Sequence, residues 1–124
     1  MIKDIEHVQV VLDPDHAVNQ GSIVALRDGR LLLGFNQERG LTHTDSGQSC
    51  VTFSSDRGDT WTPPTVVWPY SEHTGNWDCA FAELANGDLL MHTRVCSFMA
   101  PTALADIHSD QTIGPPPGRP ERLK

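Results

Sequence analysis

The sequence predicts an all-β protein built from antiparallel strands, and three observations support this. Two segments align without gaps at an offset of 58 residues, and each reads as a strand, a two-residue turn and a strand. A third segment, 49–54, is rich in residues that favour strands. No long stretch of the chain has the 3.6-residue periodicity of an amphipathic helix.

The two aligned segments, 22–33 and 80–91, predict two copies of one hairpin unit. Each carries a dipeptide of the kind favoured in tight hairpin turns, Asp-Gly at 28–29 and Asn-Gly at 86–87. In the commonest turn of this kind both positions need positive φ. The apolar runs on either side of the turns suit strands that are buried on both faces.

A tight turn is expected directly after the third strand, where residues 54–61 read Ser-x-Asp-x-Gly-x-Thr-Trp. The short side chains of Ser54 and Asp56 can bond turn amides that lack a ladder partner. Gly58 can adopt a positive φ that other residues resist. Thr60 completes the pattern, and Trp61 supplies a large apolar side chain where the chain re-enters the sheet.

This pattern resembles the Asp box, or BNR repeat, of the sialidase (neuraminidase) superfamily, whose fold is a six-bladed β-propeller. The resemblance covers roughly residues 19–95 and implies that the box is a structural hairpin away from the active site. It implies a four-stranded antiparallel blade over 22–68, with an outer strand at 65–68, and the inner hairpin of a second blade over 78–95. Residues 8–12 are expected to form an outer strand that would close the ring.

The domain organisation predicted on this basis is a partial β-propeller over 1–98 and an irregular tail over 99–124. The tail is rich in Pro and Gly near 113–120, a composition that cannot form β-ladders. Propellers close with roughly 4 to 8 blades, so one and a half blades predict a fragment of a longer protein. A small domain with a different packing is the alternative. Open strand edges would favour self-association.

Three candidate site residues follow from the resemblance. A Gln-Glu-Arg element at 37–39 and an Asp-Ser-Gly element at 45–47 precede the box, as similar elements do in the family. Arg39 would then help to bind the sugar, Asp45 would be the catalytic acid/base, and Asp78 would line the pocket. Without the resemblance, the residues around Asp45 predict only a turn. Arg39 is then as consistent with a solvated loop charge as with a binding residue, and Glu38 would only pair with it in solution.

The resemblance implies a retaining exo-hydrolase that removes terminal sialic acid or related sugars. Such an enzyme needs a carboxyl group of raised pKa and arginines that grip the substrate carboxylate. It also needs a tyrosine nucleophile, but Tyr70, the single tyrosine, is expected on an outer loop. Asn-Gln-Gly at 19–21 replaces the family's first arginine element. We therefore expect a fragment that is inactive alone. The alternatives are a non-catalytic Asp-box propeller that binds carbohydrate or protein, and a truncation product without function.

Composition limits the remaining possibilities. The net charge of −7 disfavours binding to nucleic acid or to an anionic membrane, and no apolar run is long enough to span a membrane. The start of the sequence lacks the apolar core of a signal peptide, which favours a cytosolic location. The cysteines and histidines have no metal-ligand spacing, so no metal or other cofactor is expected. We expect Cys50, Cys79 and Cys96 to be buried, inert thiols.

Overall fold

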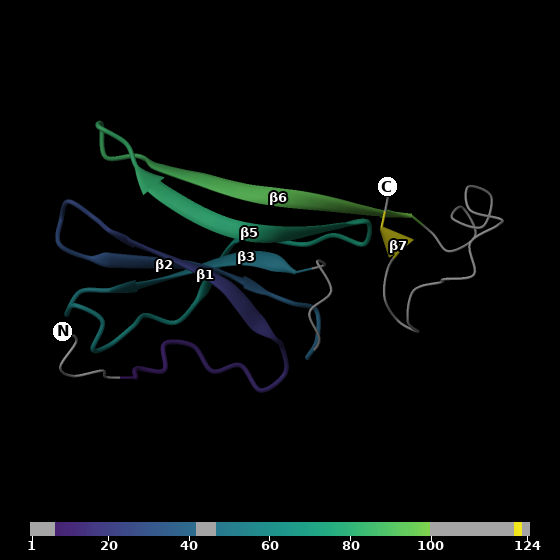
Figure 1. The fold of residues 1–124 in the computed structure, drawn as a ribbon, viewed down its shortest axis with the longest axis horizontal. Helices are drawn as coiled ribbons and strands as arrows, with labels where there is room; N and C mark the ends of the chain where they lie inside the picture. Colours follow the sequence, from purple (N-terminus) through teal and green to yellow (C-terminus); the bar gives the residue numbers. More distant parts are fainter. Residues whose placement is uncertain (1–6, 42–46, 100–120, 123–124) are drawn as a thin grey trace, which may run out of the picture.

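The computed structural model describes residues 7–41, 47–99 and 121–122, and all regular structure in these ranges is β-strand. The strands form two antiparallel groups, one of four strands and one of three (Figure 1). The prediction of an all-β fold with antiparallel strands is therefore confirmed.

The four-stranded sheet contains β1 (Val18–Ala25), β2 (Leu31–Gln37), β3 (Gln48–Ser54) and β4 (Thr65–Trp68), in that spatial order. Each strand pairs with the next one along the chain in an antiparallel ladder. The four strands that the sequence predicts within 22–68 are all present. The sheet is a simple meander, so β1 and β4 are its two edges.

The second group contains β5 (Thr74–Glu83), β6 (Leu89–Met99) and β7 (Glu121–Arg122), paired in that order. The β5–β6 hairpin begins before and ends after the predicted range of 78–95. The extra length arises because the polar start of β5 pairs with the end of β6, from Thr74 opposite Ser97 onward.

Two sequence expectations at the ends of the chain are corrected. Residues 8–12 form no strand, because they have no ladder partner in the described part of the chain, and Leu12 is 77% exposed. The predicted tail of 99–124 begins one residue too early, because Met99 belongs to β6 and pairs with Glu121 of β7. Glu121–Arg122 of that tail form β7, and residues 100–120 and 123–124 lie outside the described residues.

The two hairpin turns have the same geometry at the 58-residue offset, although their turn type differs from the expected one. Positive φ occurs at Gly29 (+89°) and Gly87 (+91°) and not at the residues before them. This is the pattern of a turn whose last position is left-handed, followed by a bulge. Both turns also have the same two backbone hydrogen bonds. In the first turn Leu26 N donates to Arg30 O at 2.8 Å and Gly29 N donates to Leu26 O at 3.0 Å. In the second turn Leu84 N donates to Asp88 O and Gly87 N donates to Leu84 O at the same two distances.

The turn at 54–61 is held by its own side chains. Ser54 Oγ accepts from Gly58 N at 2.8 Å and donates to Asp56 Oδ1 at 2.7 Å. Asp56 Oδ1 also accepts from Thr60 N at 2.9 Å. Gly58 has a φ of +103°, and its carbonyl accepts from Trp61 Nε1 at 2.9 Å. The turn therefore satisfies its unpaired amides locally, without contacts from another element.

We expect Asp56 to make the stability of the chain depend on acid pH. Hydrogen bonds from Thr60 and then Ser54 lower the pKa of the Asp56 carboxyl from 3.8 to about 2. Because the folded-state pKa is depressed, this stabilisation is complete above about pH 4 and is lost as the pH falls through about 2. Asp56→Asn should therefore unfold at lower urea than wild type at about pH 6, and the difference should shrink towards about pH 2.

The measurement is a urea midpoint by circular dichroism at several pH values. Asp59→Asn is the matched control, because the Asp59 carboxylate makes no hydrogen bond or ion pair with another described residue. An Asp56→Asn difference that stays constant from neutral to acid pH would contradict the assignment.

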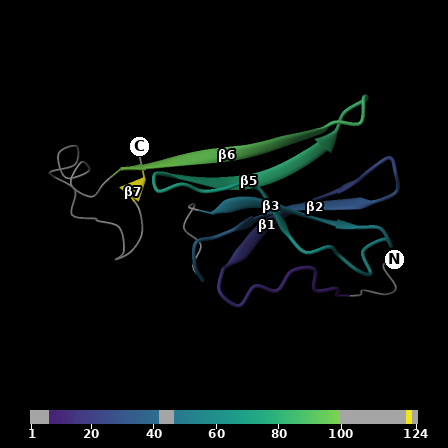
Figure 2. The same ribbon diagram turned by 180° about the vertical axis from the view of Figure 1, so that it is seen from behind.

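The two sheets pack through β5, which lies against β1, β2 and β3 (Figure 2). Gly34 of β2 lies close to β5, because a Cβ at that position would lie 2.4 Å from the Phe81 ring. Leu32 and Phe35 are 0% and 2% exposed. Leu32 and Phe35 point to opposite faces of the strand, so β2 is buried on both faces.

Candidate functional site

Polar residues gather at one end of the two sheets. The register places Val18 of β1 and Gln48 of β3 on either side of Gln37, the last residue of β2. A bridge between Gly47 and Asn76, with Asn76 N donating to Gly47 O at 2.8 Å, brings the start of β5 to the same end. We call this the polar end, which comprises 13–20, 36–41, 47–48 and 70–78. The turn at 54–61 lies at the opposite end of the sheet, since Ser54 pairs with Leu31.

Two bulges at the polar end hold non-glycine residues in the left-handed region. Gln20 has a φ of +57° and Asp78 a φ of +58°, and each lies within a register shift of its hairpin. They are 58 residues apart, so they occupy the same position in the two repeats. Left-handed φ is costly for such residues and bulges re-aim side chains, often beside active sites. The repeat offset marks Gln20 as the counterpart of Asp78, although neither residue type signals a bulge.

Asp78, one of the predicted site residues, pairs with a cation on the facing strand. Its Oδ2 lies 3.5 Å from Arg94 Nη2, with about half of each side chain exposed. The Arg94 guanidinium also lies over the Trp77 ring, 4.3 Å from its centroid. The site residue that sequence reasoning missed here is Arg94, which only the β5–β6 register brings to Asp78.

Arg39, the predicted sugar-binding residue, is held by the segment that precedes β5. Its Nη2 donates to the carbonyl of Ser71 and, at 3.1 Å, to that of Thr74. The guanidinium lies 4.4 Å from the Tyr70 ring centroid. Arg39 therefore joins the β2–β3 connection to the start of β5, four residues before Asp78. The predicted acid/base, Asp45, lies outside the described residues.

Glu38 is not in solution beside Arg39, as the sequence suggests, but is only 1% exposed. Asn19 Nδ2 donates to Glu38 Oε1 at 3.3 Å, and Glu38 N donates to Ala17 O at 2.9 Å. The carboxylate is buried because the segment before β1 folds across the end of β2. This contact joins the Asn-Gln-Gly element to the Glu-Arg element within the polar end.

A buried asparagine connects the two sheets behind the Asp78 bulge. Asn36 is 0% exposed, its Nδ2 donates to Asn76 O at 2.8 Å, and its Oδ1 accepts from Cys79 N at 3.3 Å. The two backbone groups flank the bulge, so one side chain satisfies a polar backbone atom on each side of it. An asparagine that directly follows the apolar run 31–35 is the sequence signal for this role.

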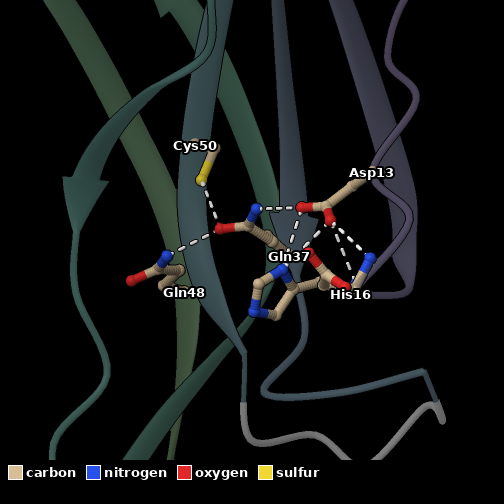
Figure 3. Close-up of polar contacts among 6 residues, drawn as sticks. Asp13, His16, Gln37, Gln48 and Cys50 are labelled. Atoms are coloured by element: carbon tan, nitrogen blue, oxygen red, sulfur yellow. Dashed lines mark hydrogen bonds and ion pairs between the residues drawn. The ribbon is translucent and has the colours of Figure 1, made fainter.

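A second polar network joins the segment before β1 to β2 and β3 at this end (Figure 3). The Asp13 carboxylate accepts from His16 N at 3.1 Å and contacts His16 Nδ1 at 3.0 Å. Gln37 Nε2 donates to Asp13, while Gln37 Oε1 accepts from Gln48 Nε2 at 2.7 Å and lies 3.9 Å from Cys50 Sγ. The network fastens the segment before β1 to the adjoining ends of β2 and β3.

The chemistry available in this network is limited. A backbone hydrogen bond from Asp15, then bonds from Gln37 and His16, outweigh desolvation and lower the pKa of Asp13. Burial, and then the Cys79 and Asp13 charges, raise the pKa of the Cys50 thiol to about 11, which keeps it protonated and unreactive. All three cysteines are buried, as the sequence predicts.

The described ranges contain neither a metal-binding cluster nor a membrane-spanning helix. No group of three or more His, Cys, Asp or Glu residues there is placed to hold a metal ion. None of those residues belongs to a helix that is long and apolar enough to cross a membrane.

Comparison with known proteins gives a fold relative but no family. No family model and no curated protein sequence matches the chain. The crystal structure of a protein of unknown function from Dyadobacter fermentans DSM 18053 is similar, with a TM-score of 0.66 and 20% identity over 92% of this chain. The match covers 33% of that protein, so this chain spans about a third of its length. At this identity the likeness concerns the fold alone.

Proposed function

We propose that this chain is part of a sialidase-like glycoside hydrolase that removes terminal sialic acid or a related acidic sugar with retention of configuration. The observation that carries the proposal is the pair of equivalent bulges, Gln20 and Asp78, at the polar end. They lie at the same end as Arg39 and at the opposite end from the box-like turn, as in the family that the sequence resembles.

The proposal includes a propeller architecture. In it the β1–β4 meander is one blade, and the β5–β6 hairpin is the inner half of the next. Three observations support this: the strand order of the meander, the packing of β5 against β1, and the hairpin geometry that repeats at 58 residues. The likeness to part of a much longer chain is consistent with further blades in a complete ring.

The proposed roles follow the resemblance. The Asp45 carboxyl would give its proton to the leaving glycosidic oxygen and later take a proton from the attacking water. Arg39 would bind the acidic sugar, and Asp78 would line the pocket. The nucleophilic tyrosine, its assisting glutamate and the remaining arginines would come from other blades, so this chain alone would bind the sugar without cleaving it.

A second candidate is a non-catalytic Asp-box propeller that binds carbohydrate or a protein. The engagement of Arg39 favours it, because two backbone carbonyls and the Tyr70 ring already occupy its guanidinium. Gln20 favours it as well, since an amide cannot grip a carboxylate with the two charged parallel donors of an arginine.

Titration of the 124-residue chain with sialyllactose and with lactose, followed by NMR chemical shifts, tests the proposal. We expect binding of sialyllactose alone, weakened about tenfold by Arg39→Lys because a lysine lacks the planar fork. Arg27→Lys is the matched control: Arg27 also donates to a backbone carbonyl, that of Ala85, but at the opposite end. Equal binding of both sugars would favour the second candidate, and binding of neither would overturn the first candidate for this chain and leave only the protein-binding form of the second.

A fluorogenic sialoside separates binding from hydrolysis. The chain alone should release no fluorophore. Release that Asp45→Ala abolishes would show that the chain is itself an enzyme and would overturn the interpretation as a fragment.

A further inference from the structure

The two repeats form one interface inside the chain, and its contacts can be assigned residue by residue. On β2, Leu32, Gly34 and Asn36 face β5: Leu32 is 0% exposed, and Asn36 bonds backbone groups of β5. On β5, the Phe81 ring fills the space above Gly34, where a Cβ would meet it at 2.4 Å. A face of one hairpin is therefore built to receive the inner strand of the next.

The second hairpin carries the same face, and no other part of the described chain covers it. The residues of β6 that correspond to Leu32, Gly34 and Asn36 lie 58 positions later. They are Leu90, His92 and Arg94, which share one face of β6. Leu90 is 56% exposed, and the other two side chains are exposed as well. We call these three residues the open face of β6. In Figures 1 and 2, β6 lies on the side of the hairpin that is remote from the first sheet.

The first hairpin carries the complementary face, also uncovered. The counterpart of Phe81 is Ile23, which is 60% exposed, and its neighbours on the same face, Gly21 and Ala25, are exposed too. We call these the open face of β1. Large exposed aliphatic side chains of this kind mark interaction surfaces when they fall on a face that is buried in an equivalent unit.

We propose that, when this chain is on its own, a second copy of it covers these faces, with the open face of β1 of one copy packed head-to-tail on the open face of β6 of the next. The occupant that fits best is a hairpin of the same repeat, because β2 already binds one. The side-chain sizes at the contact also remain complementary. Inside the chain the large Phe81 packs over Gly34, whereas between copies the smaller Ile23 would pack over the larger His92. The interface is heterologous, so copies can add in sequence until a ring closes.

Sedimentation of three variants of the full chain tests the proposal. Wild type should form assemblies larger than the 13.6 kDa monomer. Ile23→Glu and Leu90→Glu should each weaken self-association at least tenfold and leave the chain monomeric, because a buried carboxylate would lack a partner. Val67→Glu, on the outer strand β4 and 42% exposed in the wild type, is the matched control and should assemble normally.

Mixing the two interface variants gives the sharpest result. Ile23→Glu keeps an intact open face of β6 and Leu90→Glu keeps an intact open face of β1, so an equimolar mixture should form a dimer and nothing larger. Monomeric wild type would overturn the proposal and assign the faces to further units of one polypeptide. A mixture that stays monomeric, or assembly that either variant leaves unchanged, would overturn the head-to-tail arrangement. Circular dichroism of each variant establishes that it is folded.

Discussion

Leu32→Ala should lower the free energy of unfolding by about 2–5 kcal/mol, whereas Leu90→Ala should change it by less than about 0.5 kcal/mol. The two leucines occupy the same position in the two repeats, 58 residues apart. Leu32 is 0% exposed beneath β5, so truncation leaves a cavity between the sheets. Leu90 is 56% exposed in the monomer, so its truncation removes few contacts.

Urea unfolding by circular dichroism at low protein concentration measures both values, because dilution keeps any self-association from adding to stability. Both variants replace a leucine by alanine, so the two losses of stability differ only through the surroundings of the side chain. Equal losses for the two variants would show that the second hairpin is covered in the monomer, against the packing described above.

Sequence pattern predicted the strands well because their signals are local. The Asp-Gly and Asn-Gly turns and the apolar runs beside them place β1, β2, β5 and β6 without tertiary information. Residues 8–12 have an equally strand-like composition, but a strand also needs a ladder partner, which composition cannot supply.

The candidate site was less predictable because it depends on contacts between distant segments. Arg39 could be named from its motif, but the carbonyls that hold it lie 32 and 35 residues further along the chain. Glu38 reads as a loop charge, and only the fold of the segment before β1 buries it. The bulge at Gln20 places the left-handed φ on the glutamine and not on the adjacent Gly21, so only its repeat partner Asp78 makes it visible.

Gly34→Val should destabilise the chain by about 1–3 kcal/mol, because overpacking at this position pushes the two sheets apart. A Cβ there would lie 2.4 and 2.6 Å from two Phe81 ring atoms, well inside van der Waals contact. The Phe81 ring cannot move freely, because β5 is held to β2 by Asn36 on the same face. Gly40→Val is the matched control, since a Cβ at Gly40 would meet nothing within 4 Å.

A double-mutant cycle with Phe81→Ala identifies the source of this cost. If the clash with the ring is responsible, valine at position 34 should cost much less in the Phe81→Ala background, where its methyl groups fill the space that the ring vacates. The coupling between the two substitutions should then favour the double variant by about 1 kcal/mol or more. If the free-energy effects of the two substitutions simply add, the strain of Gly34→Val lies in the β2 backbone and not in the contact between the repeats. Additivity would also weaken the case that glycine at this position exists to receive the inner strand of the next hairpin.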